Sequence, residues 1–353
     1  MSAPDTAAPP RPASTGPATP APPAGTGFRA SLRVAHLVHR GTVRTIGIVL
    51  LLAAAVTFGL YLWQRLAPDR ERCRGFYRDG FAPDQLDEYR ACWEATLGYQ
   101  EASSWYNLLG GDPGLWFFVP VLLAAVLAAG PLVARELESG TFRLAWTQAE
   151  TPRRWLTGRL ALFAVVAVVT GAVLVGLFRF ARTTGEQWPA PWDRAGTFHA
   201  IGPVMVAYLL LALAVGALVG LLLRRVLPAM ALATLATGAL LAVFHRVRMD
   251  LWPTKSAEWQ FGQPWAAPRD ASWTERGLLT SAGERVPQPG NLCTRDWDER
   301  HACLRENGYA GEWVEYHPAS HIWPLQLVET ALVLGVTAVI ALLALRALRR
   351  LAP

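Results

Sequence analysis

Ionisable side chains within long apolar runs are the first candidates for chemistry in this sequence. Glu329 lies in the last such run, with Gln326 three residues before it. Charged groups are costly in a lipid bilayer and usually serve a function there. Two hypotheses are open for Glu329. It faces a substrate in an outer vestibule together with Gln326, or it pairs with an arginine near the surface, such as Arg179 or Arg246.

Histidine spacing offers a second kind of chemistry. His317 and His321 are four residues apart, a spacing at which two imidazoles can share a metal ion on a helix. Pro318 lies between them at a predicted helix entrance, so packing at the membrane interface is the preferred interpretation and a metal pair is the alternative. We expect no metal to be bound by this chain.

The four cysteines favour disulfides over a metal. Cys73 and Cys92 lie in one polar loop, and Cys293 and Cys303 lie in another. No C-x-x-C pair is present, which argues against a zinc site. Of the three ways to pair four cysteines, the local pairs Cys73–Cys92 and Cys293–Cys303 are preferred, because an oxidising exterior permits disulfides.

The sequence lacks the motifs of the common hydrolases. A phosphate-binding loop needs Gly-Lys-Ser/Thr, but the only lysine, Lys255, follows Thr254. No G-x-S-x-G or H-E-x-x-H motif occurs. We therefore expect no enzymatic activity in this chain.

The composition is that of a membrane protein. Hydrophobic residues make up 52% of the 353 and charged residues only 17%. Six apolar runs are each close to the length that crosses about 30 Å of hydrocarbon. They are Thr45–Trp63, Leu115–Val133, Leu160–Phe178, Ile201–Leu223, Val226–Phe244 and Pro324–Leu345. The predicted fold is an all-α integral membrane domain of six helices over residues 45–353, and Gly216 and Gly220 would allow two of these helices to pack closely.

The residues before the first run divide into two parts. Residues 1–27 are rich in Pro and Ala and are predicted to form a disordered cytoplasmic tail. Residues 28–44 alternate arginines with apolar residues, which predicts an amphipathic helix on the inner membrane surface.

The arginines predict the orientation in the cell membrane. The formal net charge is +6, and four groups of arginines fall on one side of the membrane if there are six spans: those of the N-terminal segment, those in residues 134–159, Arg224-Arg225, and those after the last run. This bias places both termini and the 134–159 loop in the cytoplasm. Residues 65–114 and 246–323 then form long extracellular loops, and all four cysteines lie outside. The arginines flank apolar runs and form no single face, which argues against nucleic-acid binding.

The most patterned polar stretch is residues 134–160, between the second and third apolar runs. Charged residues, among them Glu136 and Glu138, follow the apolar helix directly, and Gly140 fits a helix stop. Thr141 can cap a short second helix that carries large apolar side chains. Thr151-Pro152 is another helix start. The residues singled out for contact with a partner are Glu136, Glu138, Gly140, Thr141, Leu144, Trp146, Pro152 and Arg153.

These residues carry a resemblance to a known family. Arg135-Glu136-Leu137-Glu138-Ser139-Gly140-Thr141, then Leu144, then Pro152-Arg153, resemble the segment after the second span of type-2 ABC permeases. The sequence of this segment is similar to that of a permease subgroup from high-G+C bacteria. The resemblance implies a coupling loop that contacts a separate ABC ATPase, which would bind ATP and magnesium. It also implies two permease chains, as a homodimer or heterodimer. We expect an exporter, and the apolar residues available to line its pathway favour a hydrophobic or amphipathic substrate.

Two other functions stay open at this point. The chain could be a non-transporting sensor or scaffold that displays its extracellular loops. It could instead be a proton-coupled transporter that uses Glu329. The role of the long 246–323 loop is not predicted.

Overall fold

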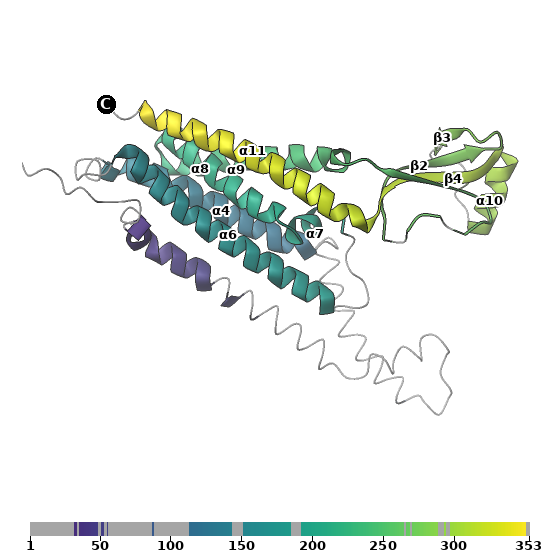
Figure 1. Cartoon of the computed structure of the whole chain (residues 1–353), viewed down its shortest axis with the longest axis horizontal. Coiled ribbons are helices and arrows are strands. Elements are labelled where there is room, and N and C mark those ends of the chain that lie inside the picture. Colours follow the sequence, from purple (N-terminus) through teal and green to yellow (C-terminus); the bar gives the residue numbers. More distant parts are fainter. Residues whose placement is uncertain are drawn as a thin grey trace, which may run out of the picture.

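The computed structural model describes the helix bundle and the segment before its last helix. The described residues are 32–33, 35–48, 51–52, 55, 87, 113–142, 151–184, 192–264, 266–268, 270–288, 293 and 297–350. Within them the fold is mostly helical, and a small sheet projects from one end of the bundle (Figure 1).

Five long apolar helices form the bundle. They are α4 (Pro113–Glu138), α6 (Pro152–Thr184), α8 (Val204–Leu223), α9 (Val226–Val247) and α11 (Ile322–Arg349). Each is long and apolar enough to cross a membrane, because about 20 residues at 1.5 Å each span the hydrocarbon. The second to sixth predicted runs are thus confirmed as helices, whereas most of the first run, Thr45–Trp63, lies outside the described residues.

The helix α8 is the centre of the bundle. Its apolar window is 72% buried, against 17% for the windows of α6, α9 and α11. It packs against all four other long helices, as expected of a helix that is apolar on every side. A Cβ on Gly216 would lie 2.5 Å from the Cβ of Ala129 on α4, and one on Gly220 would lie 3.0 Å from the Gly130 carbonyl oxygen. The predicted close packing at these two glycines is confirmed.

The two ends of the bundle differ. We call the end with the α4–α6 connection the elbow end; it also holds the α8–α9 turn and the end of α11 (Figure 1). A left-handed Arg224 (φ 54°) ends α8 and makes this turn tight. Residues 35–48 form a helix that packs beside α6 near the same end. Its helical state agrees with the amphipathic helix expected at 28–44, while its place on the membrane surface stays a prediction.

The opposite end, the sheet end, carries an antiparallel sheet of order β1-β4-β2-β3. Its elements are β1 (Lys255–Gln260), β2 (Ser272–Thr280), β3 (Arg285–Pro287), β4 (Tyr309–His317) and the helix α10 (Trp297–Glu306). The prediction of an all-α chain therefore holds for the bundle and not for this segment. Trp, Val, Tyr and Thr in β2 and β4 favour strands.

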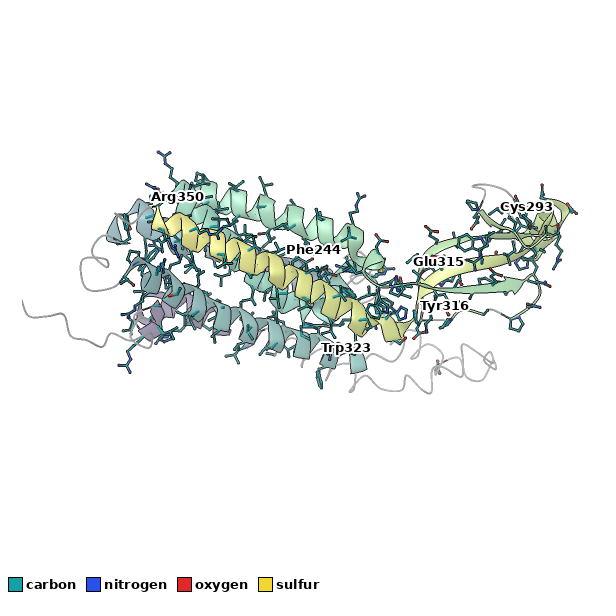
Figure 2. All side chains as sticks on the ribbon, turned by 45° about the horizontal axis from the view of Figure 1, so that its top comes forward. Phe244, Cys293, Glu315, Tyr316, Trp323 and Arg350 are labelled. Carbon is teal, nitrogen blue, oxygen red and sulfur yellow. A yellow bond between two sulfur atoms is a disulfide. The ribbon has the colours of Figure 1, made fainter. Side chains whose placement is uncertain are left out.

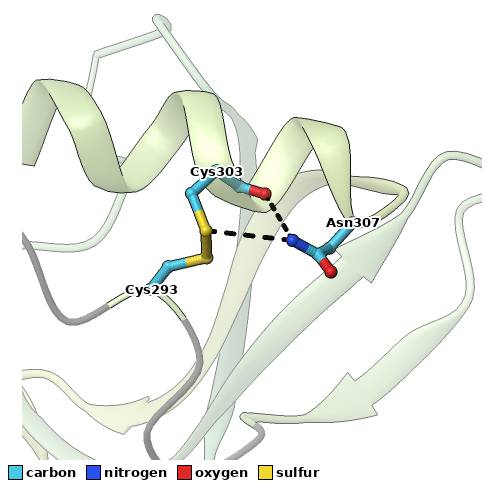
Figure 3. The surroundings of a disulfide bond; sticks show 3 residues. All are labelled: Cys293, Cys303 and Asn307. Atoms are coloured by element: carbon cyan, nitrogen blue, oxygen red, sulfur yellow. Dashed lines mark hydrogen bonds between the residues drawn. A yellow bond between two sulfur atoms is a disulfide. The ribbon is translucent and has the colours of Figure 1, made fainter.

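A disulfide staples α10 to the chain before it. Cys293 and Cys303 are joined with their Cα atoms 5.9 Å apart, and the Asn307 side-chain amide donates a 2.8 Å hydrogen bond to the Cys303 carbonyl (Figure 3). The other predicted pair, Cys73 and Cys92, lies outside the described residues.

The sheet is held to the bundle at several points. Figure 2 shows β4, with Glu315 and Tyr316, running from the sheet toward Trp323 at the start of α11. Two hydrogen bonds tie the sheet segment to the turn before α7 (Ala195–Ala200): Trp192 Nε1 donates to the Asp270 carbonyl at 2.9 Å, and the Ser272 hydroxyl donates to Asp193 at 2.6 Å.

Candidate functional site: the elbow between α4 and α6

The elbow, residues 134–160, begins with a sharp helix end and finishes with a capped helix start. Gly140 has φ +72°, a left-handed conformation that favours glycine, and α4 stops two residues earlier. At the other side the Thr151 hydroxyl accepts a 3.4 Å hydrogen bond from the Arg154 amide, and Pro152 opens α6. Both predictions, the stop at Gly140 and the start at Thr151-Pro152, are confirmed.

The Glu136 carboxylate is the centre of a clasp between the two helices. Arg159 on α6 donates to both of its oxygens, from Nε and from Nη2, each at 2.8 Å. Trp155 Nε1 adds a third hydrogen bond at 2.9 Å, and the Arg159 guanidinium lies 4.6 Å from the Trp155 ring centroid. A two-pronged arginine–carboxylate pair fixes both distance and orientation. We call Glu136, Trp155 and Arg159 the elbow clasp.

The clasp lies on a packed base. Trp155 and Leu156 are fully buried, and Arg159 is only 6% exposed. Leu132 and Leu137 from α4 pack in the same hydrophobic cluster, with Phe142 against it. Because the ion pair is largely shielded from water, removing either partner would leave a costly unpaired charge.

A histidine from the N-terminal helix lies beside the clasp. His39 Nε2 is 4.0 Å from the Glu136 carboxylate, and the His39 ring meets the edge of Phe163 at 5.1 Å. Burial, and next the positive charge of Arg159, hold the pKa of His39 below its ordinary value. His39 is therefore neutral near pH 7, and its contact with Glu136 is not an ion pair. Its Nε2 is buried without a hydrogen-bond partner among the described residues.

The second acidic residue of the elbow reaches a different helix. Glu138 accepts a 2.9 Å hydrogen bond from the Val226 amide, the first residue of α9. A carboxylate at a helix N-terminus satisfies a free amide and interacts favourably with the helix dipole. The end of α4 is thus tied to α6 through Glu136 and to α9 through Glu138.

The remaining predicted elbow residues are placed only in part. The Thr141 hydroxyl lies 3.0 Å from the Ser139 hydroxyl and donates to the Glu136 carbonyl at 3.4 Å. Arg153 is exposed in the first turn of α6. Leu144 and Trp146 lie outside the described residues.

A second polar cluster is buried at the sheet end. Glu329 is fully buried and pairs with Arg248, whose Nε donates to it at 2.8 Å, while the Tyr208 hydroxyl donates at 2.9 Å. Of the two hypotheses for Glu329, pairing with an arginine therefore fits this contact. The arginine is Arg248, however, and not Arg179 or Arg246 as predicted. Gln326, also fully buried, accepts from the Val204 amide at 3.3 Å and donates to the Phe198 carbonyl.

His199 completes this cluster as a neutral ring. Its Nδ1 meets the Ala195 carbonyl, an acceptor, so Nδ1 carries the proton and Nε2 accepts from Arg248 at 2.7 Å. Burial, and next the charge of Arg248, hold the pKa of His199 well below its ordinary value. The 3.8 Å between His199 Nε2 and Glu329 is therefore not an ion pair.

The partners of Glu136 and Glu329 were not predicted from the sequence. Arg159 and Arg248 were each visible as charges at the ends of apolar runs, and a charge near lipid requires a counter-charge. Their pairing with Glu136 and Glu329 depends on the packing of helices far apart in sequence. Within the part of the chain that the structure describes, no group of three or more His, Cys, Asp or Glu residues could hold a metal.

Comparison with known proteins gives one family. The model of the ABC-2 membrane transporter related family matches residues 49–248, which are 200 of the 353 residues and run from the first apolar run through α9. The sheet and α11 lie beyond the matched residues. No curated protein and no solved structure matches the sequence. With the match over more than half its length and with its apolar helices, the chain belongs to the ABC-2 membrane transporter related family and is an ABC-2-type permease.

Proposed function

We propose that this chain is the membrane-spanning subunit of an ATP-driven exporter and that a separate ATPase subunit docks on the elbow. The main support for the proposal is the elbow clasp, which lies within the residues matched by the family model. The clasp and the Glu138–Val226 hydrogen bond make one unit of the ends of α4, α6 and α9. A push on that unit tilts three spans together, which is the motion an alternating-access transporter requires.

The arginines support an orientation with the elbow in the cytoplasm. Several described arginines lie at the elbow end: Arg135, Arg153, Arg154, Arg224, Arg225, Arg346, Arg349 and Arg350. Two arginines near the sheet end have internal partners. Arg179 donates to the Ile201 carbonyl at 2.6 Å, and Arg248 pairs with Glu329. Arg248 is buried in its pair with Glu329 and is not a surface charge at the sheet end, whereas Arg179 and Arg246 are exposed there. The Cys293–Cys303 disulfide at the sheet end fits an oxidising exterior.

Membership of the family supports the rest of the proposed assembly. Five described spans in one chain favour a pathway formed by two permease chains, as a homodimer or a heterodimer, with ATP and magnesium on two ATPase chains. The apolar surface of the bundle favours a hydrophobic or amphipathic substrate. Under this proposal Leu144, Trp146 and Arg153 contact the ATPase, while Glu136 and Glu138 position the elbow.

The test is co-purification of the full chain with its ATPase. Arg153→Glu reverses an exposed charge on the elbow, and Arg349→Glu makes the same reversal at the end of α11 on the same side of the bundle. The proposal predicts that Arg153→Glu lowers recovery of the ATPase and that Arg349→Glu leaves it near the wild-type level. Equal recovery with both variants contradicts docking on the elbow.

A further inference from the structure

The chain passes between bundle and sheet at two short helical turns. η2 (Arg248–Leu251) leads from α9 to β1, and η3 (Ala319–His321) leads from β4 into α11. His317 is the last residue of β4 and His321 is the last residue of η3. Neither histidine takes part in the elbow or in the Glu329 cluster.

The two imidazoles face each other closely. The Nδ1 atoms are 3.0 Å apart, with the ring centroids at 5.3 Å. His317 is fully buried, and His321 is 9% exposed. His317 Nε2 lies 2.9 Å from the Met249 carbonyl oxygen, which only accepts, so the His317 proton is on Nε2. The Nδ1 lone pair of His317 therefore points at His321. It accepts a hydrogen bond from His321, whose proton is on Nδ1.

We propose that His317 and His321 form a two-histidine site for a divalent first-row transition-metal ion such as zinc, nickel or copper. Metal–imidazole bonds of about 2.0–2.1 Å place two nitrogens roughly 3 Å apart when the ligands are adjacent on the metal. The observed 3.0 Å separation matches this spacing. The metal takes the place of the proton between the rings, and that proton moves to His321 Nε2 through solvent. Both rings stay neutral.

The surroundings define the class of ion and its strength of binding. Imidazole nitrogens suit zinc, copper and nickel and do not suit magnesium or calcium. The Met249 carbonyl acts as the outer partner that fixes the tautomer of a metal-binding histidine. Water completes the coordination at the partly exposed His321. The positive charge of Lys255 on β1 reaches His321 and opposes a bound cation.

A metal here would join the two crossings between bundle and sheet. It ties the end of β4 to the start of α11 and, through Met249, holds η2, whose Arg248 pairs with Glu329. This proposal departs from the expectation that the chain binds no metal. It does not depend on the proposed transport function, because metal binding is measured without the ATPase.

The experiment is zinc binding by the full chain in detergent, in competition with a chromogenic chelator, after purification with a tag that contains no histidine. The wild type is compared with His317→Gln, His321→Gln and Lys255→Ala. His301→Gln is the matched control, because His301 stacks on Phe261 in the same extramembrane segment, away from the pair. Magnesium replaces zinc in a parallel titration, and thermal melting without metal checks folding.

The proposal predicts one zinc per chain in the wild type and no response to magnesium. His321→Gln and His317→Gln each weaken binding about tenfold or more, as expected for the loss of a ligand. His301→Gln binds as the wild type does, and Lys255→Ala binds about two- to fivefold more tightly. If His317→Gln does not fold, the test depends on His321→Gln, which changes the more exposed of the two histidines. Wild-type binding no tighter than that of His321→Gln, or an equal loss in His301→Gln, overturns the proposal.

Discussion

Glu136 on α4 and Arg159 on α6 meet through two hydrogen bonds of 2.8 Å across 23 residues of sequence, at the point where both helices leave the bundle. The pair is mostly shielded from water, and Trp155 adds a third hydrogen bond to the same carboxylate. The two described ends of the elbow, residues 134–142 and 151–160, are therefore held to each other. Under the proposed function, a force on the elbow would therefore act on α4 and α6 together.

The first prediction concerns the strength of the elbow clasp. Arg159→Gln leaves the Glu136 carboxylate without its charged partner and should lower the free energy of unfolding by about 3 kcal/mol. Thermal melting of the purified chain measures the loss. Arg153→Gln, one turn or more away and exposed, should change the melting temperature little. A loss as large in Arg153→Gln would show that the clasp is not the source of the stability.

The second prediction concerns Glu138 and α9. Glu138→Ala removes the acceptor for the Val226 amide and should destabilise the first turn of α9 by about 1 kcal/mol. Glu138→Gln keeps an acceptor and loses only the charge, so its effect should be smaller. Hydrogen exchange of the α9 amides measures both. Exchange that is unchanged in Glu138→Ala would argue against the cap.

The third prediction separates the two hypotheses for Glu329. Glu329→Gln leaves Arg248 buried without a counter-charge and should destabilise the chain by about 3–5 kcal/mol. The double variant Glu329→Leu with Arg248→Met removes both charges and should regain much of that loss. If the pair is structural, transport survives in the double variant. Transport that is lost in a stable, correctly folded double variant would favour a substrate or proton role for Glu329.

The fourth prediction follows from the lowered pKa of His39. Because burial and Arg159 lower this pKa in the docked helix, protonation favours the undocked state. Docking of residues 35–48 is therefore fully stable above about pH 6.5, the ordinary pKa of histidine, and weakens as the pH falls below it. Hydrogen exchange of this helix, corrected for intrinsic rates, compares pH 7.5 with pH 5.5.

His39→Phe provides the control for this pH dependence. It keeps a ring against Phe163 and removes the titrating group. Its exchange should not respond to pH over the same range. A wild-type helix that also shows no response would remove His39 from any account of docking.

The sequence was sufficient for the bundle and for the ends of the elbow. The thickness of the membrane sets the length of an apolar helix that crosses it, and five of the six predicted runs are helices in the described residues. Gly140 and Thr151-Pro152 act through local backbone geometry, so their roles are readable from adjacent residues. The glycines at 216 and 220 belong to the same class, because only a residue without Cβ permits such close approach.

The contacts between segments that are distant in the chain could not be predicted from the sequence alone. The choice of Arg248 as the partner of Glu329 depends on how η2 packs against α11, and 81 residues separate Arg248 from Glu329. The sheet at residues 255–317 was missed because its strands carry many polar residues, as in Lys255–Gln260 and Ser272–Thr280, and such a sequence resembles a loop. Glu136 was expected to contact a partner protein, and the structure places its carboxylate in the clasp with Trp155 and Arg159.

Cysteine crosslinking to the ATPase tests the central claim most directly, which is that a separate ATPase docks at the elbow end. One cysteine is placed at Ser139 in the elbow, and a second variant places it at Ser281 in the turn after β2 at the sheet end. The account predicts a crosslink to the ATPase from Ser139→Cys and none from Ser281→Cys, with the unsubstituted chain as background. A crosslink from Ser281→Cys with none from Ser139→Cys would contradict it.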